Sequence, residues 1–151
     1  MNDIRSILFA EDNPNDVELT LTALAEHHLA NEVVTVSDGA EALDYLHRRG
    51  RFEQRHPGHP VLVLLDLKMP KVNGLEVLRA IKQDPDLERI PVVMLTSSRE
   101  EPDLRRSYEL GVNAYVVKPV GFQAFVEAVR HLGVFWAVHN EPPPGSVRRP
   151  S

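Results

Sequence analysis

Short, uninterrupted apolar runs that alternate with helix-like segments constrain the fold of this chain more than any other feature. The runs cover residues 7–10, 61–65, 92–95 and 115–117, and a further strand is expected over residues 32–36. Runs of this length between polar residues predict strands that are buried on both faces. Strands that alternate with helices in this way indicate an α/β fold, with a parallel sheet covered by helices on both sides.

The segments between these strands have apolar residues at helical spacing. The first helix is expected to be capped by Asn15 or Asp16. Two further helices follow Asp38-Gly39 and Asn73-Gly74, and a weaker one over residues 100–110 is expected to end at Gly111. The last helix has the most apolar stripe, formed by Phe122, Phe125, Val126, Val129 and Leu132.

Bulk properties predict one soluble domain over residues 1–140 and a disordered tail over residues 141–151. The chain has 151 residues, of which 42% are hydrophobic, and the tail is rich in proline and poor in apolar residues. A net charge of -5 with no basic stripe argues against nucleic-acid binding. No apolar stretch approaches the roughly 18 residues of a membrane span, and the N-terminus lacks the layout of a signal peptide. A cytoplasmic location, without membrane binding, is therefore expected.

Polar side chains follow four of the strands, and their chemistry points to a metal-assisted phosphoryl site. Glu11 and Asp12, Asp66, Thr96, and Lys118 stand at the carboxyl ends of strands, the edge at which ligands bind in open parallel sheets. Three carboxylates in close contact repel one another, and a hard cation such as Mg²⁺ relieves that repulsion. With the metal and an ammonium group holding phosphoryl oxygens, Asp66 can attack phosphorus.

Each of these residues has an ordinary interpretation when it is taken alone. Acids, lysines and hydroxyls are common at strand ends, and Tyr115 fits a core position. The joint arrangement in this chain order is much harder to obtain by chance. The seven histidines are scattered, and solvated positions explain them better than metal ligation does.

The residues as a set resemble the response-regulator receiver domain of two-component signalling. The segments FAEDNPND, LVLLDLKMPKVNGLEVL, IPVVMLTSS and GVNAYVVKPV carry the resemblance, which covers about residues 5–138. It implies a flavodoxin-like fold with strand order 2-1-3-4-5. It also implies that Glu11, Asp12 and Asp66 bind Mg²⁺ together with the main-chain carbonyl of Lys68, and that Asp66 is the phosphoacceptor.

The same resemblance implies a switch beside the phosphoacceptor. Thr96 and Lys118 would contact the phosphoryl group, and Tyr115 would be the aromatic switch partner of Thr96. Gly74 would permit the loop after Asp66, and the peptide between Lys118 and Pro119 would be cis.

A narrower resemblance is to stand-alone regulators that pair with bacterial phytochromes. It rests on the long loop over residues 48–60, the segment DLERIPVVMLTSSREEPDLRRSYELGVNAYVVKP, and the ending at Phe135-Trp136. It implies phosphorylation by a sensor histidine kinase, here a bacteriophytochrome, with a histidine phosphotransfer protein as a candidate onward partner. It also implies a homodimer through the fourth helix, fifth strand and fifth helix, with Phe135 and Trp136 in the interface. The alternative is that Phe135 and Trp136 fold back onto their own domain as a cap.

Lys68 and Ser98 occupy the two positions that flank the path of the attacking water in the receiver family, so they bear on the phosphoryl lifetime. Three rival functions fit the sequence less well. A phosphatase or phosphotransferase of the haloacid dehalogenase type would need a second aspartate where Lys68 stands. A nucleotide-binding module would need a glycine-rich phosphate loop, which the sequence lacks. A pseudo-receiver would lack an acid, the threonine or the lysine, and none is missing. A signalling protein that is phosphorylated, rather than an enzyme with a separate substrate, is expected.

Overall fold

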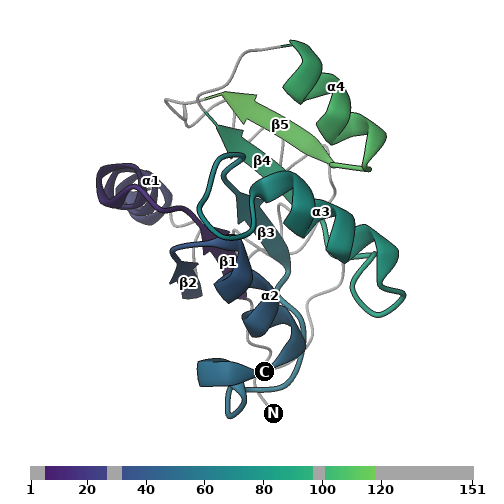
Figure 1. Ribbon diagram of the computed structural model, residues 1–151. Helices are drawn as coiled ribbons and strands as arrows, with labels where there is room; N and C mark the ends of the chain where they lie inside the picture. Colours follow the sequence, from purple (N-terminus) through teal and green to yellow (C-terminus); the bar gives the residue numbers. More distant parts are fainter. Residues whose placement is uncertain (1–5, 27–31, 97–100, 118–151) are drawn as a thin grey trace, which may run out of the picture.

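The computed structural model describes residues 6–26, 32–96 and 101–117. A single sheet of five parallel strands forms its centre, in the order β2-β1-β3-β4-β5, which confirms the predicted flavodoxin-like topology (Figure 1). The strands are β1 (Ser6–Ala10), β2 (Glu32–Val36), β3 (Leu62–Leu65), β4 (Val92–Thr96) and β5 (Ala114–Val117). The helices are α1 (Pro14–Glu26), α2 (Gly39–His47), the 3₁₀ turn η1 (Gly50–Phe52), α3 (Gly74–Gln83) and α4 (Glu101–Glu109).

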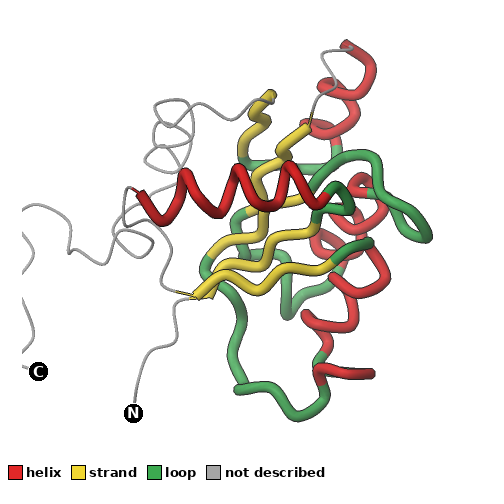
Figure 2. Tube along the Cα trace, turned by 90° about the vertical axis from the view of Figure 1, so that its left-hand side faces the viewer, coloured by secondary structure: helices red, strands yellow, loops and turns green. Residues whose placement is uncertain are grey.

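Helices lie on both faces of the sheet. Figure 2 shows α1 on one face and α2, α3 and α4 on the other, with α2 and α3 packed against each other. Every residue of β1 and of β3 is buried, as expected for inner strands that are covered on both sides. The apolar strands therefore form the core, and the polar groups lie in the segments that follow their carboxyl ends.

The cap of α1 differs from the prediction. The side-chain oxygen of Asn13, rather than Asn15 or Asp16, accepts hydrogen bonds from the main-chain nitrogens of Asn15 at 2.9 Å and Asp16 at 3.2 Å. The reason is Pro14, which occupies the first helical position, where its fixed φ fits and its missing N–H costs nothing. The helix therefore begins earlier, and the capping residue is the one before the proline.

The predicted starts of α2 and α3 and the end of α4 are confirmed. Asp38 accepts a hydrogen bond from the main-chain nitrogen of Glu41 at 2.8 Å, and Asn73 accepts one from Glu76 at 3.0 Å. Gly111 follows α4 with a φ of 95°, a left-handed conformation that glycine adopts without strain. Local sequence was sufficient at these sites because the capping groups lie within one turn of the helix.

The long loop over residues 48–60 is more ordered than its polar sequence indicates. It contains η1, whose Phe52 is buried and meets the Tyr45 ring edge-on, with 5.1 Å between the ring centroids. Arg55 holds the rest of the loop through hydrogen bonds from Nε to the Tyr45 carbonyl (2.7 Å) and from Nη1 to the carbonyls of His56 (2.7 Å) and Gly58 (2.9 Å). Burial lowers the pKa of the Arg55 guanidinium, which also lies 4.2 Å above the centre of the Tyr45 ring.

Several predictions concern residues outside the described part of the chain. They include the last helix with Phe122 to Leu132, the domain boundary at residue 140, and the tail over residues 141–151. Among the residues that the structure describes, no helix is both long and apolar enough to cross a membrane.

Candidate metal centre

Three carboxylates from two separate segments meet at the carboxyl edge of the sheet. Glu11, Asp12 and Asp66 each place one carboxylate oxygen within 4.8 Å of the others. The sequence predicted this group of three, and the parallel sheet explains it, because β1 and β3 are neighbours that end at the same edge. The predicted convergence of these three acids is therefore present in the structure.

The backbone fixes where the acids lie. The main-chain nitrogen of Glu11 donates to the Val36 carbonyl at 3.0 Å, and that of Asp66 donates to the Ala10 carbonyl at 3.0 Å. Both bonds continue the ladders of the sheet by one residue beyond the strand ends. The acids therefore extend directly from buried, hydrogen-bonded strands, which suits a preorganised ligand set.

Burial makes this group of acids an unfavourable arrangement without a cation. Glu11 is 3% exposed and Asp66 is 7% exposed, whereas Asp12 faces solvent. One oxygen of Glu11 accepts a hydrogen bond from the main-chain nitrogen of Asn13 at 3.2 Å. Carboxylate oxygens with room for water on one side match the donors that Mg²⁺ prefers. The residues present fit a hard divalent cation.

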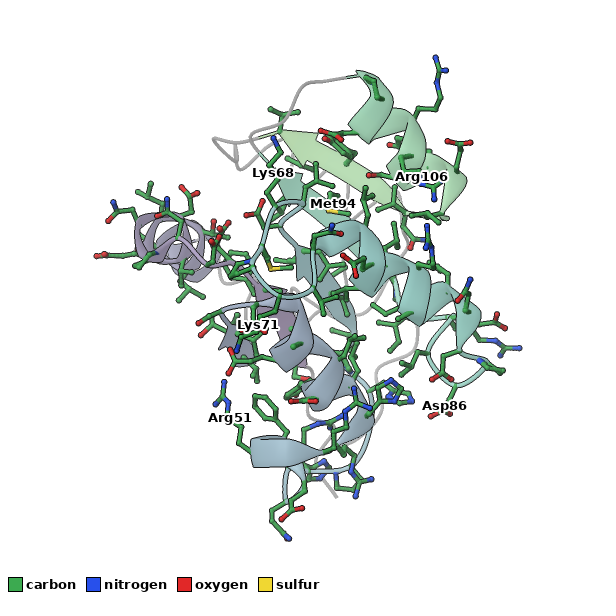
Figure 3. All side chains as sticks on the ribbon, in the orientation of Figure 1. Arg51, Lys68, Lys71, Asp86, Met94 and Arg106 are labelled. Carbon is green, nitrogen blue, oxygen red and sulfur yellow. The ribbon has the colours of Figure 1, made fainter. Side chains whose placement is uncertain are left out.

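The loop between β3 and α3 lies beside this site. Its ends are joined by a hydrogen bond of 2.8 Å from the Gly74 nitrogen to the Leu67 carbonyl. A Cβ atom on Gly74 would overlap the Asp66 carbonyl oxygen, so the predicted need for glycine here has a steric cause. Lys68 lies on this loop with its side chain exposed. Figure 3 shows that Lys68 extends away from the start of α2, whereas Lys71 lies near it.

A cavity of about 610 Å³ lies beside the acids. Most of its lining comes from the loop between β3 and α3. The segment after β1, the first turn of α3 and α4 contribute one residue each. The lining residues are Asp12, Leu67, Lys68, Met69, Pro70, Asn73, Leu75 and Asp103. Of the three acids, Asp12 alone lines this cavity, and α4 contributes Asp103 to its wall.

The remaining predicted site residues lie on β4 and β5 or beyond them. The register pairs Met94 with Tyr115 and Thr96 with Val117, so Tyr115 is one diagonal step from Thr96 on the next strand. Tyr115 is partly buried and packs against the core. Lys118 and Pro119, like Ser98, Phe135 and Trp136, lie outside the described residues.

Two features of this region were not predicted from the sequence. Asp103 reaches the cavity from α4, and Lys71 lies 3.6 Å from the carboxylate of Asp38. Both depend on how elements distant in the chain pack against one another, and neither has a local sequence signal. Asp38 was identified only through its place before a helix.

Comparison with known proteins agrees with this geometry. The model of the response regulator receiver domain matches residues 7–130. Response regulator Rcp1 of Synechocystis sp. is 40% identical over 135 residues, which span 89% of this chain and 90% of Rcp1. The Mn²⁺-bound structure of Rcp1 covers 98% of this chain and 100% of its own at 37% identity, with a TM-score of 0.73.

Two bacteriophytochrome response regulators of known structure are more similar. AtBRR is 63% identical with a TM-score of 0.84, covering 93% of this chain and 100% of its own. RtBRR is 61% identical with a TM-score of 0.83, covering 95% of this chain and 87% of its own. A sheet of order 2-1-3-4-5, three carboxylates at its carboxyl edge and these matches lead to one conclusion: the chain belongs to the response regulator receiver domain family.

Proposed function

We propose that Asp66 accepts a phosphoryl group from a sensor histidine kinase, and that the protein relays the signal through contacts with other proteins. The observation that carries the proposal is the position of Asp66, which is buried and lies within 4.8 Å of two further carboxylates at an accessible edge of the sheet. Burying a carboxylate this close to two others costs free energy, as expected at a functional site rather than in a structural role.

Glu11, Asp12 and Asp66 would hold Mg²⁺ together with the main-chain carbonyl of Lys68. The donor set supports this assignment, and the Rcp1 structure is a Mn²⁺-bound form, a related cation with the same preference for oxygen ligands. When bound, Mg²⁺ neutralises charge on the phosphoryl oxygens during transfer. The acids of the chain supply the ligands, and Asp66 also supplies the nucleophile.

The transfer step is a displacement at phosphorus. A carboxylate oxygen of Asp66 forms a bond to the phosphorus of a phosphohistidine, and the phosphorus–nitrogen bond breaks with its electron pair remaining on the imidazole. The product is an acyl phosphate on Asp66. Thr96 and Lys118 would contact the phosphoryl oxygens, and Tyr115 would move with Thr96 as the switch. Loss of the phosphoryl group to water would complete the cycle without a separate substrate.

The kinase partner that we propose is a bacteriophytochrome. The proposal rests on the names of AtBRR and RtBRR, which are bacteriophytochrome response regulators with identities above 60%. A histidine phosphotransfer protein is the proposed onward partner, and the proposed location is cytoplasmic. Membership in the receiver family leaves the haloacid dehalogenase alternative without support, and Lys68 stands where its second aspartate would be needed.

Incubation with acetyl phosphate and Mg²⁺ tests the phosphoacceptor. Intact-mass spectrometry should detect one added phosphoryl group on the unchanged protein and none on Asp66→Asn, whose side chain is nearly the same size. Asp103→Asn is the matched control, because Asp103 lines the same cavity but is not among the three acids, and it should still be labelled. Labelling of Asp66→Asn to the normal extent would refute the assignment.

A further inference from the structure

The loop between β3 and α3 rests directly on the start of α2. A Cβ atom placed on Gly39 would overlap the main-chain carbonyl of Val72, so the two backbones touch with no side chain between them. Val72 is partly buried and packs against the core cluster, which includes the α2 residues Ala42, Tyr45 and Leu46. The contact therefore fixes one point of the loop against a helix that itself packs on β1, β2 and α3.

Lys71, the residue before this contact, adopts a conformation that it does not favour alone. Its φ is 64°, in the left-handed region that costs a residue with a side chain free energy. Its ammonium group lies 3.6 Å from a carboxylate oxygen of Asp38, whose side chain is only 9% exposed. A tertiary contact thus accompanies the strained turn, as expected where surrounding structure determines a backbone conformation.

Asp38 is a rigid anchor for this ion pair. Its other carboxylate oxygen accepts the hydrogen bond from Glu41 that caps α2, at 2.8 Å. The side chain of Glu41 in turn accepts a hydrogen bond from the main-chain nitrogen of Ser37 at 2.8 Å, which holds the residue before the cap. Lys71 therefore binds a carboxylate that has little freedom to follow the loop if the loop moves.

We propose that Lys71 and Asp38 are positioning residues for the metal centre. Their ion pair, with the contact between Gly39 and Val72, sets the path of residues 67–72, and so places the main-chain carbonyl of Lys68 relative to the three carboxylates. This inference rests on the proposed function, in which that carbonyl is a metal ligand. In this proposal Lys71, although it is itself a cation, favours binding of a cation at the site because its ion pair fixes the position of the loop.

Charge alone predicts the opposite effect for Lys71. Removing a positive charge from the neighbourhood of a cation site lowers repulsion, so simple Coulomb attraction would tighten metal binding in Lys71→Met. Positioning predicts weaker binding, because the loop loses its anchor. Asp38→Asn breaks the same ion pair while keeping a side chain that caps helices equally well. The sign of the change in Lys71→Met therefore separates the two explanations.

Mn²⁺ affinity measured by electron paramagnetic resonance of the free ion is the test. Lys71→Met and Asp38→Asn should each weaken Mn²⁺ binding by about two- to fivefold, the range of a partly exposed ion pair. The double variant should be no weaker than either single variant, and Lys71→Arg should retain normal affinity. Melting temperatures without metal should change little in these variants, so that a general loss of stability is excluded.

Two control variants accompany them. Lys68→Met removes a positive charge from the same loop without touching the ion pair, and it should tighten Mn²⁺ binding. Arg49→Met breaks an ion pair of 2.8 Å with Asp44 in the last turns of the same helix, and it should leave the affinity unchanged.

The outcomes distinguish this inference from the function on which it rests. Unchanged or tighter Mn²⁺ binding in Lys71→Met, with normal binding to the unchanged protein, would overturn the positioning role alone. Absence of Mn²⁺ binding to the unchanged protein, or binding that survives Asp66→Asn and Asp12→Asn without loss, would overturn the proposed metal centre itself.

Discussion

Two residues near this site, Gly74 and Gly39, are important because they have no side chain. Gly74 and Gly39 have no side chain at points where the backbone of another segment passes within contact distance. Gly74 faces the Asp66 carbonyl and Gly39 faces that of Val72. The need for Gly74 was expected from the resemblance, whereas the contact of Gly39 required the three-dimensional structure.

Gly74→Ala should disturb both stability and phosphorylation. The new methyl group would overlap the Asp66 carbonyl oxygen, which is backbone and cannot rotate away, so the strand end or the loop must shift. We expect a loss of about 1–3 kcal/mol in the free energy of unfolding, the usual range for overpacking. Urea denaturation and the rate of labelling by acetyl phosphate would measure the two effects.

Gly58→Ala is the control for Gly74→Ala. Gly58 has a φ of 112° but open space around its Cβ position, so alanine there meets backbone strain without any clash. It should cost about 1–3 kcal/mol through backbone strain and leave the labelling rate unchanged. A labelling rate reduced equally in both variants would contradict the steric explanation.

At the scale of elements, the sequence predicted the ends of the strands better than it predicted the cap of α1 and the order in the long loop. Strand ends could be placed because each apolar run stops at a polar residue, and a parallel sheet brings all such ends to one edge. The cap of α1 is Asn13 and not the predicted Asn15 or Asp16, because Pro14 takes the first helical position. The order in residues 48–60 could not be predicted, because Arg55 acts on carbonyl groups whose positions depend on the fold.

Arg55→Ala should unfold the loop over residues 48–60 while sparing the phosphorylation site. Three hydrogen bonds from a charged group and the contact with the Tyr45 ring are lost together. We expect a loss of about 2 kcal/mol, hence a melting temperature lower by about 4–8 °C in a calorimetric scan. Arg55→Lys should recover only part of this, because one ammonium group cannot reproduce the planar fork.

Arg51 offers the comparison within the same loop. Arg51 pairs with Glu41 at 2.9 Å and covers the Phe52 ring, but its side chain is 60% exposed. Arg51→Ala should therefore cost less than about 1 kcal/mol. Equal losses in the Arg51 and Arg55 variants would show that burial of Arg55 does not organise the loop.

For the molecule as a whole, folding gathers charge that the unfolded chain keeps apart. The sheet brings Glu11 and Asp12 next to Asp66, although more than fifty positions separate them in the sequence. Folding therefore carries a repulsive cost at neutral pH that a bound cation relieves. Stability and metal binding are consequently linked.

Mg²⁺ should raise the melting temperature of the protein. At about 100 times its dissociation constant, Mg²⁺ adds about 2.7 kcal/mol, which corresponds to roughly 5–10 °C for a chain of this size. Differential scanning calorimetry with Mg²⁺ and with a chelator would measure the shift, with potassium chloride matching the ionic strength. Asp12→Asn should reduce the shift, because the ion loses a charged ligand. A full shift in that variant would place the stabilising ion elsewhere.

The last expectation is a homodimer through α4, β5 and the predicted final helix. Leu104 and Tyr108 lie one turn apart on the otherwise polar α4, and they are 37% and 52% exposed, so two apolar side chains face solvent on the same side of this helix. Phe135 and Trp136, outside the described residues, continue the apolar character of the last predicted helix. Tryptophan, tyrosine and phenylalanine are the residues most enriched at interface cores, which favours a second copy as the cover for this face.

Light scattering at micromolar concentration should report twice the monomer mass, and Trp136→Ala or Leu104→Asp should lower it. Trp136 is the single tryptophan, so its emission should shift to longer wavelength when dilution separates the dimer. Leu19→Asp is the matched control, because Leu19 is 68% exposed on α1, outside the proposed interface, and its replacement should leave the mass unchanged. A monomer mass for the unchanged protein, with and without a beryllofluoride mimic of the phosphoryl group, would refute the dimer. A loss of mass in Leu19→Asp alone would move the interface to α1.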